Sequence, residues 1–451
     1  MTVFQPLKFP ENFLWGVATA AHQNEGNNTN NDFWAWEQAG HTHDGTISGL
    51  ATDWWDAGRR RAEADFARAA EMGLNTLRLS LEWSRIEPEE NRWDDAAIDR
   101  YRQLLTELRR LNITPMVTLH HFTNPLWLAA RGGWLADDVV SRFERYAAHV
   151  VAALGDLVDL WCTINEPLVY AYLSHLVGDW SPGKHSFPQT FKIAARMALA
   201  HRAAEHAIHA RQPQAQVGLV KHQPIFDPLR DNRADKLVSG WQETLFNRRM
   251  FEAVYENRLR FPLNLFAREI SVGRDDFIGI NYYGRQTVKF SLGAPFTLFG
   301  KLVAPPGAEM WDAPWADREI YPHGVYRVCR QAAKYKKPIF ITENGFADAA
   351  DTRRPRFLLT HLAALHRAIQ SGADVRGYYY WTFVDNYEWV EGWSTRFGLV
   401  ALNPETQERT PRRSAELYGE IARANAITPA MVEKFAPEAM ASVFGMAGNG
   451  V

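Results

Sequence analysis

Two glutamates stand directly behind short apolar segments of the sequence, where a pair of carboxyl groups could do acid–base or nucleophilic chemistry. Glu166 follows residues 159–164, and Glu343 follows residues 339–342. Cleavage of a glycosidic bond needs two such groups, one to protonate the leaving oxygen and one to attack or stabilise the anomeric carbon. A lone glutamate at a strand end is more commonly part of a structural ion pair. A restricting neighbour such as Pro167 weakens that alternative without eliminating it.

Other polar and aromatic residues also stand at the ends of apolar segments. They are Arg78, His120, His121, Asn165, His222, Asn281, Tyr282, Tyr283, Asn344 and Trp381. The carboxyl ends of parallel strands meet at one end of a barrel, where active sites are built. We therefore expect these side chains to converge with the two glutamates on one pocket.

The elements that must position these residues are short β-rich segments that alternate with helical segments. The predicted strands cover residues 13–18, 76–80, 114–119, 159–164, 217–220, 277–280, 339–342 and 377–381. The predicted helices, whose apolar residues recur three and four positions apart, cover residues 57–72, 96–111, 139–154, 190–211, 324–336, 355–371 and 412–424. No linker-like segment divides the series. This alternation predicts an α/β fold, a single (β/α)8 TIM barrel domain over residues 1–451, rather than an open doubly wound sheet.

The long irregular segments follow predicted strands. They cover residues 19–56, 165–189, 282–320 and 382–410. In a barrel such loops lie over the carboxyl ends of the strands and build the site. The Ala-, Met- and Gly-rich tail from about residue 427 is expected to be loosely ordered beyond its first turns.

Composition excludes several classes of protein. The chain has 451 residues, of which 46% are hydrophobic, so it is not a disordered chain. A net charge of -2 without long runs of one sign predicts neither a nucleic-acid nor a membrane partner. Cys162 and Cys329 are expected to be buried thiols. No signal peptide or membrane helix is evident in the sequence, so a cytoplasmic location is expected. The 17 tryptophans exceed what core packing usually needs and hint at a binding site.

Seven motifs in order make the chain resemble glycoside hydrolase family 1, the retaining β-glucosidase family, over roughly residues 8–425. They are FLWGVATAAHQNEG at 13–26, RLSLEWSRIEP at 78–88, the pair His120-His121, TINEP at 163–167, NYY at 281–283, ITENG at 341–345, and Trp381 through DNYEW at 385–389 to RFG at 396–398. Each motif alone is weak, but seven in colinear order are specific. The resemblance implies the barrel fold, with the acid on strand four and the nucleophile on strand seven.

The resemblance also implies catalytic roles. Glu166 matches the family's general acid/base and Glu343 its nucleophile. Arg78 and Tyr283 match groups that contact the nucleophile, and a guanidinium and a phenol would keep that carboxylate ionised. Asn165 matches the residue that binds the sugar 2-hydroxyl.

The same resemblance assigns sugar-binding roles. Gln23, His121, Glu388 and Trp389 match residues that bind the 3-, 4- and 6-hydroxyls, and Trp381 matches the ring on which the sugar stacks. Asn281 and Phe397 stand in the matched motifs and are further candidates for substrate contact. No metal and no organic cofactor is implied.

Three departures from the family pattern lie on the leaving-group side of the pocket. Where the family often has His-Trp-Asp-x-Pro, this chain has HFTNP at 121–125, and after Tyr172 it has GDWSPG at 178–183. Arg318 stands where the family usually places a tryptophan platform, for which Trp311 or Trp315 could substitute. The resemblance therefore predicts the bound sugar better than it predicts the preferred leaving group.

The predicted function is that of a retaining exo-β-glucosidase acting on aryl or alkyl β-glucosides or β-glucooligosaccharides such as cellobiose. We also expect some β-galactosidase, β-fucosidase and transglycosylation activity. The sequence does not decide between a monomer and a homo-oligomer. A 6-phospho-β-glucosidase is the first alternative, disfavoured because Glu388 would repel phosphate and Arg396-Phe397 lacks the expected lysine–tyrosine pattern. A metal-dependent amidohydrolase-type barrel built on His41, His43 and strand-end histidines, and a non-catalytic carbohydrate-binding barrel, are the remoter alternatives.

Overall fold

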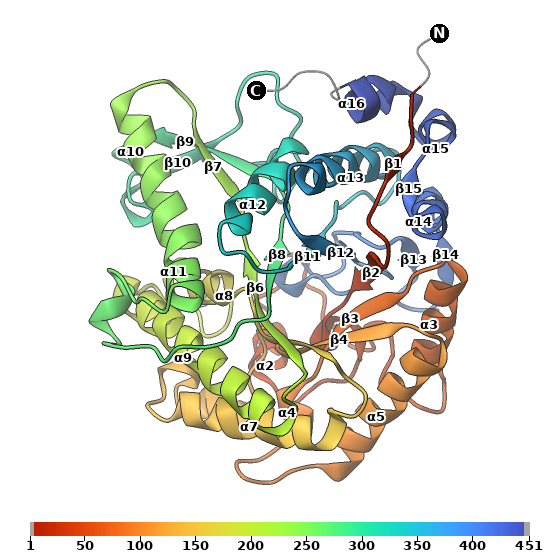
Figure 1. Ribbon diagram of the computed structural model, residues 1–451. Coiled ribbons are helices and arrows are strands. Elements are labelled where there is room, and N and C mark those ends of the chain that lie inside the picture. Colours follow the sequence, from red (N-terminus) through yellow and green to blue (C-terminus); the bar gives the residue numbers. More distant parts are fainter. Residues whose placement is uncertain (1–3, 446–451) are drawn as a thin grey trace.

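Eight parallel strands form a closed barrel at the centre of the computed structural model, which describes residues 4–445 (Figure 1). The strands follow the barrel in the order β11-β12-β2-β3-β4-β5-β6-β8. Their bounds are β2 Leu14–Ala18, β3 Thr76–Ser80, β4 Thr114–His120, β5 Leu160–Asn165, β6 Gln216–His222, β8 Phe277–Asn281, β11 Ile339–Asn344 and β12 Val375–Trp381. Each overlaps a predicted strand, so the predicted TIM barrel is confirmed.

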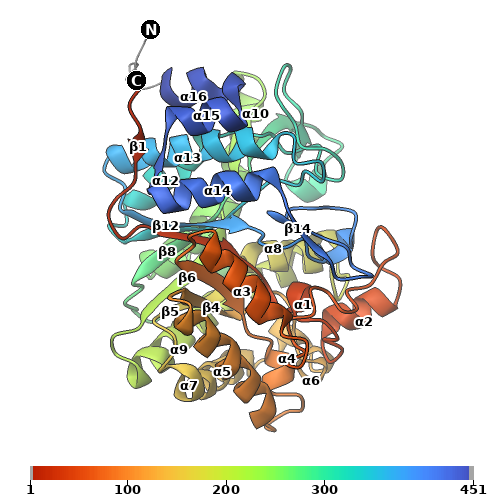
Figure 2. The same cartoon turned by 90° about the vertical axis from the view of Figure 1, so that its right-hand side faces the viewer.

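Helices surround the barrel (Figures 1 and 2). The long ones are α3 Arg61–Glu71, α5 Asp95–Arg110, α7 Val139–Leu154, α9 Phe187–Arg211, α12 His323–Ala333, α13 Arg354–Gln370 and α14 Arg413–Ala424, all predicted. α5 shows why they form. The Asp94 side chain accepts hydrogen bonds from the first-turn N–H groups of Ala96 and Ala97, and Leu104 and Leu108 on its apolar face are buried.

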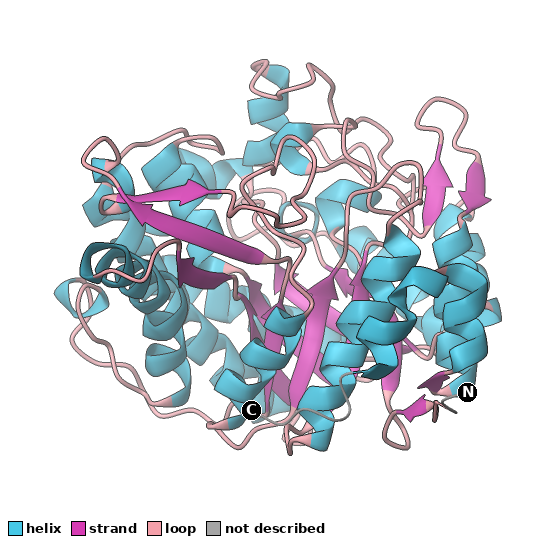
Figure 3. Ribbon diagram, turned by 90° about the horizontal axis from the view of Figure 1, so that it is seen from above, coloured by secondary structure: helices cyan, strands magenta, loops and turns pink. Residues whose placement is uncertain are grey.

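Strand register aligns the polar strand ends. Asn281 of β8 pairs with His222 of β6 on one side and with Glu343 of β11 on the other. Asn165 at the end of β5 pairs with Val220 of β6. Four neighbouring strands therefore bring their polar residues to one end of the barrel, where most of the loops also gather (Figure 3).

The long loops carry short elements of their own. The loop over residues 19–56 contains α1 Ala21–Asn24 and α2 Asp32–Gln38, and the loop over residues 165–189 contains α8 Pro167–Tyr172 and the π-helical turn η2 Leu173–Val177. The last long loop contains β13 Val400–Leu402 and β14 Arg409–Pro411, and the shorter loops after β3 and β4 contain α4 Trp83–Ile86 and α6 Leu126–Ala130. Pro167 suits the first turn of α8 because its missing N–H would have no partner there.

A layer outside the barrel is built from the segments that follow β6 and β8, and it was not predicted. It contains β7 Ile225–Pro228, α10 Arg233–Gln242, the π-helical turn η3 Glu243–Arg248, α11 Arg249–Tyr255, β9 Arg285–Phe290 and β10 Gly300–Val303. The three strands form a separate sheet in the order β10-β9-β7. α10 begins after Asn232, whose side chain accepts a hydrogen bond from the Asp235 N–H. The segment after this cap mixes polar and apolar residues, so it has no clear helical pattern.

The C-terminal segment corrects the expectation of a loosely ordered tail for residues 427–445. β15 Ala426–Ile427 pairs with β1 Leu7–Lys8, and α15 Pro429–Phe435 and α16 Met440–Phe444 pack beside α13 and α14 (Figure 2). Val432, Phe435 and Phe444 are buried there, so the small residues between them mark close packing. Residues 446–451 lie outside the described residues.

Two further expectations concern cysteines and membranes. Cys162 and Cys329 are buried free thiols, as predicted. Within residues 4–445, no helix combines the length and the apolar character that a membrane crossing requires.

Candidate active site

Glu166 and Glu343 face one cavity of about 580 Å³ at the carboxyl end of the barrel. Glu343 lies within β11, and Glu166 follows β5 and precedes the first residue of α8. Both side chains are almost completely buried. The fourth and seventh predicted strands therefore bring these two residues to one pocket, as expected.

Two donors hold the Glu343 carboxylate. Arg78 Nη1 lies 2.6 Å from Oε1, and the Tyr283 hydroxyl donates to Oε2 at 2.7 Å. Arg78 is fixed in turn because it donates to the Thr118 hydroxyl at 3.0 Å and to the side-chain Oδ1 of Asn165 at 2.7 Å. Burial raises the pKa of Glu343, whereas Arg78 and Tyr283 stabilise the charged form and oppose that rise.

Glu166 has weaker support for a charge. Its Oε1 accepts a hydrogen bond from Asn281 Nδ2 at 2.7 Å, and His222 Nδ1 lies 3.7 Å away. Burial, and then the neighbouring charge of Glu343, raise the pKa of Glu166 to about 8. At neutral pH the geometry thus favours a protonated Glu166 beside an ionised Glu343.

The backbone of Glu166 is in the left-handed region, with φ of 46°. Non-glycine residues adopt this conformation at a cost of roughly 1–3 kcal/mol, and strained residues of this kind are enriched at functional sites. The turn connects β5 to α8 and aims the carboxyl group into the cavity rather than along the helix.

Asn165 and Asn281 link the two glutamates. The Asn281 amide is oriented by Thr342, whose hydroxyl donates to Oδ1 at 2.7 Å, so that Nδ2 faces Glu166 and Asn165. Asn165 Nδ2 contacts His121 Nε2 at 3.1 Å. This network fixes the carboxyl groups before substrate binds, which lowers the reorganisation needed in the reaction.

The end of the cavity beside Trp389 carries unsatisfied polar atoms. Gln23 Nε2 donates to the Tyr387 carbonyl at 2.8 Å and to Glu388 Oε2 at 3.2 Å, but Gln23 Oε1 has no partner. His121 Nδ1 is also buried without a partner. Burial raises the pKa of Glu388 to about 8. Unpaired buried polar atoms are rare, so they indicate groups that a ligand would satisfy.

The predicted site residues divide into a lining and a supporting layer. Those that line the cavity are His121, Asn165, Glu166, Tyr283, Glu343, Trp381, Glu388, Trp389 and Phe397. Arg78, Asn281 and Gln23 are buried and hydrogen-bond to the lining residues. These twelve residues thus belong to one connected site. His120, Tyr282 and Asn344, which were also expected to converge on the pocket, do not line it.

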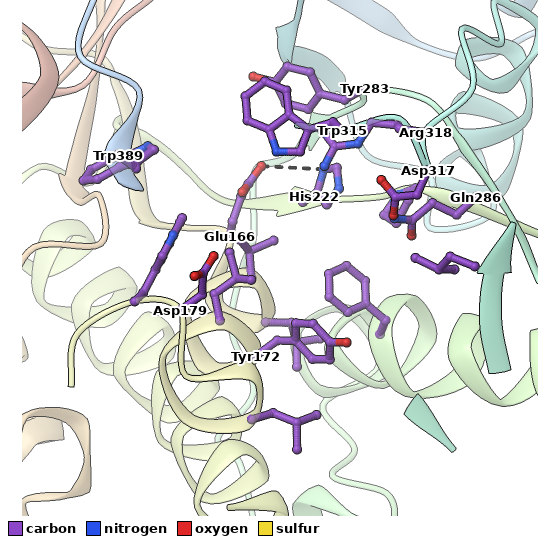
Figure 4. Close-up of a pocket in the computed structure, with 18 of the residues that line it drawn as sticks. Glu166, Tyr172, Asp179, His222, Tyr283, Gln286, Trp315, Asp317, Arg318 and Trp389 are labelled. Atoms are coloured by element: carbon purple, nitrogen blue, oxygen red, sulfur yellow. Dashed lines mark hydrogen bonds and ion pairs between the residues drawn. The ribbon is translucent and has the colours of Figure 1, made fainter. Parts of the chain in front are cut away.

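The opposite side of the cavity contains residues that the sequence analysis missed (Figure 4). Leu245 and Phe246 of η3, Gln286 of β9 and Leu302 of β10 form part of this wall. They come from the unpredicted outer layer, and no motif marks them. Among the candidate tryptophans, Trp180 and Trp315 line the cavity. Trp311 is buried next to Tyr283 and Phe397.

The histidines considered as metal ligands occupy separate places. His22 contacts Glu37, His43 lies between Glu391 and Asp179, His41 stacks on Trp36, and His120 contacts Asn124. Within the described part of the chain, one other group has three possible ligand atoms close together: His201, Glu205 and Asp275. Arg202 forms ion pairs with both acids of that group, which supplies the positive charge that buried carboxylates need.

The sequence is similar to a known protein family and to several characterised relatives. The model of glycosyl hydrolase family 1 matches residues 5–427. Beta-glucosidase A of Thermotoga maritima is 30% identical, over 93% of this chain and 99% of that protein. Beta-galactosidase of Pyrococcus woesei is also 30% identical, over 94% of this chain and 99% of that protein.

Solved structures show the same similarity. A beta-glycosidase from Pyrococcus horikoshii has a TM-score of 0.88 and 39% identity, covering 96% of this chain and 98% of that one. The beta-glucosidase from Thermotoga maritima in complex with glucoimidazole has a TM-score of 0.86 and 29% identity, covering 93% of this chain and 100% of that one.

Proposed function

The chain belongs to glycosyl hydrolase family 1, and from this premise we propose that it is a retaining exo-β-glucosidase that works by double displacement. The observation that carries the proposal is the unequal environment of the two glutamates. Glu343 contacts a guanidinium and a phenol, whereas Glu166 contacts one neutral amide and faces a negative neighbour. Two carboxyl groups held in different protonation states are what retaining glycosidases require.

The first step uses both groups. The Glu343 carboxylate attacks the anomeric carbon and forms a glycosyl ester, while the bond to the leaving oxygen breaks and that oxygen takes the proton of Glu166. Tyr283 and Arg78 hold the attacking carboxylate in position. In this mechanism the Asn165 amide binds the sugar 2-hydroxyl, a hydrogen bond that strengthens as positive charge develops on the ring.

The second step reverses the roles. Once Glu343 is an ester it has lost its negative charge, so the main electrostatic cause of the high Glu166 pKa disappears. Glu166 then accepts a proton from water as the water attacks the anomeric carbon and releases Glu343. Two inversions give a product with the configuration of the substrate.

The polar end of the cavity supports glucose as the preferred sugar. Gln23 Oε1 and His121 Nδ1 lack partners, and Glu388 is held beside them, so hydroxyl groups of a neutral pyranose would complete these hydrogen bonds. Trp381 and Trp389 supply faces for the apolar side of the ring. Galactosides and fucosides, which differ at one or two hydroxyls, should be slower substrates. The curated relatives named beta-galactosidase and beta-glucosidase agree with this mixed range.

A phosphorylated glycone is not supported by the charges around the cavity. Because burial raises the pKa of Glu388 to about 8, its repulsion of phosphate is smaller at neutral pH than the sequence indicated. The stronger argument is the missing cation. Arg318 is the one lysine or arginine among the described lining residues, and it lies across the cavity from Trp389 (Figure 4).

This difference gives a direct test of substrate class. The value of kcat/KM for 4-nitrophenyl β-glucoside should exceed that for the 6-phosphorylated analogue by about 10²-fold or more, because a buried phosphate without a cation is strongly disfavoured. A panel with the galactoside, fucoside and cellobiose measures the remaining preferences. Faster cleavage of the 6-phosphoglucoside would replace the proposed function with its alternative.

The pH dependence of kcat/KM follows from the two protonation states. Activity should rise from acid pH as Glu343 loses its proton, and it should fall as pH increases through about 8, where Glu166 loses the proton that the leaving group needs. The fall should be clear for phenyl β-glucoside and shallow for 2,4-dinitrophenyl β-glucoside, whose leaving group needs no proton. A constant rate on phenyl β-glucoside from pH 6 to 10 would contradict the assignment of Glu166.

A further inference from the structure

Arg318 occupies the leaving-group side of the cavity. It lies on the segment between β10 and α12, is half-buried, and lines the cavity with Trp315 and His222. Figure 4 shows its side chain extending beside Trp315 and His222 toward the side of the cavity that holds Glu166. A substrate whose sugar lies against Trp389 would therefore direct its leaving group toward this guanidinium.

The guanidinium of Arg318 has no carboxylate or carbonyl partner among residues 4–445. Its two acidic neighbours in sequence have other partners: Asp317 accepts from Gln286 Nε2 at 3.5 Å, and Glu319 pairs with Arg285. Arg285, close by on β9, shows the usual arrangement for such a residue, with Glu319 at 2.7 Å and Asp227 at 3.3 Å. An arginine that is half-buried and unpaired in a cavity is an available anion-binding group.

The groups facing Arg318 leave much of its charge uncompensated at neutral pH. Burial, and next the charge of Arg318, keep the pKa of His222 well below its usual value, so the ring is neutral. Glu166 and Glu388 have pKa values of about 8 and are mainly protonated. Glu343 is charged but paired with Arg78, which leaves Asp317 as the remaining anion nearby.

The surroundings of Arg318 are aromatic. Its guanidinium carbon lies 5.4 Å from the ring centroids of both Trp311 and Trp315. Tyr172, Phe187 and Phe246 also belong to the cavity. Indole rings restrict the guanidinium without using its N–H groups, so its planar donor fork stays available for a carboxylate.

We propose that Arg318 makes this enzyme selective for β-glucosides whose aromatic leaving group carries a carboxylate. This inference rests on the proposed β-glucosidase function and specifies its substrate class. The aromatic ring packs against Trp315, which lines the cavity beside Arg318, and the carboxylate accepts hydrogen bonds from the Arg318 guanidinium. The reaction itself is unchanged, since the leaving oxygen still takes its proton from Glu166.

The test compares 4-carboxyphenyl β-glucoside with its neutral methyl ester, together with the 3-carboxyphenyl isomer and its ester. For each enzyme, kcat/KM for the acid is divided by kcat/KM for the ester, so that differences in leaving-group reactivity cancel between variants. Arg318→Met should lower this ratio about tenfold or more for at least one isomer, because charge-assisted pairs are stronger than neutral contacts. Arg318→Lys should retain part of the preference, and Asp317→Asn should increase it.

A matched control removes one arginine elsewhere. Arg376→Met changes the net charge equally, but Arg376 is exposed near the start of β12, where it pairs with Asp374. Its acid-to-ester ratio should equal that of the parent enzyme. Added salt should reduce the parent ratio and leave the Arg318→Met ratio nearly constant.

The outcomes separate this inference from the proposed function. If both esters are hydrolysed and the ratio is the same in the parent and Arg318→Met for both isomers, the inference is wrong while the β-glucosidase proposal stands. If the parent enzyme hydrolyses neither esters nor acids, the proposed function itself fails. A variant that folds poorly lowers both rates together and leaves the ratio as a valid readout.

Discussion

Replacing Glu343 by alanine should lower kcat for 4-nitrophenyl β-glucoside by roughly 10⁴-fold or more, the size of effect seen when a nucleophile is removed. The substitution deletes the group that forms the ester. It also leaves Arg78 and Tyr283 without the carboxylate that they contact at 2.6 and 2.7 Å. The measurement is the steady-state rate with a control for folding by circular dichroism.

Rescue by a small anion distinguishes a lost nucleophile from a damaged site. Azide should enter the space left by Glu343→Ala and attack the anomeric carbon once, giving the α-glucosyl azide and restoring turnover. Glu408→Ala, which removes an exposed glutamate from the β13–β14 turn, serves as the matched control and should keep the parent rate. A Glu343→Ala enzyme with near-normal activity and no response to azide would contradict the assigned role.

Replacing Glu166 by alanine should affect substrates according to their leaving groups. For phenyl or alkyl glucosides and for cellobiose, the loss in kcat/KM should be roughly 10²- to 10⁴-fold, because the leaving oxygen departs without a proton. For 2,4-dinitrophenyl β-glucoside, the loss in kcat/KM should be small, and the slow step becomes hydrolysis of the ester.

The product formed with azide gives a second readout for Glu166→Ala. Azide should attack the ester from the side where water normally enters and yield the β-glucosyl azide, opposite in configuration to the product of Glu343→Ala. The Glu166→Gln variant keeps the shape of the side chain and should behave in the same way. An equal loss on good and poor leaving groups would show that Glu166 is not the acid.

Much of the fold could be predicted because the barrel strands are continuous apolar segments bounded by polar ends. For example, β11 contains the predicted residues 339–342, and β5 overlaps the predicted residues 159–164. All side chains of both strands are buried. Parallel strands covered on both faces give this continuous pattern. The helices that cover the barrel have one apolar face and could be predicted equally well. The bounds of α7, for example, are those that the sequence predicted.

The outer layer after β6 could not be predicted in the same way. Its strands are short and half-exposed, as β9 and β10 are, so they lack the apolar continuity of the barrel strands. The C-terminal helices were missed for a different reason. α15 and α16 are short, with seven and five residues, and their order comes from packing against α13, which a local sequence pattern does not contain.

The candidate site was predictable where motifs end barrel strands and unpredictable where loops fold over it. Glu166, Asn281 and Glu343 come together because strand register fixes their positions. Arg318 was recognised as a departure from the family pattern, but its lack of a partner and its position beside His222 are properties of the folded loops. The glycone end is therefore determined by local sequence, and the leaving-group end by tertiary contacts.

In the proposed mechanism, Glu343 and Glu166 act in two successive displacements. The most direct test follows the hydrolysis of 4-nitrophenyl β-glucoside by proton NMR and observes the anomeric signal of glucose before mutarotation. β-Glucose should appear first, and the α-anomer should grow only with the rate of spontaneous mutarotation. Initial release of α-glucose would show a single displacement by water and would contradict the double-displacement mechanism.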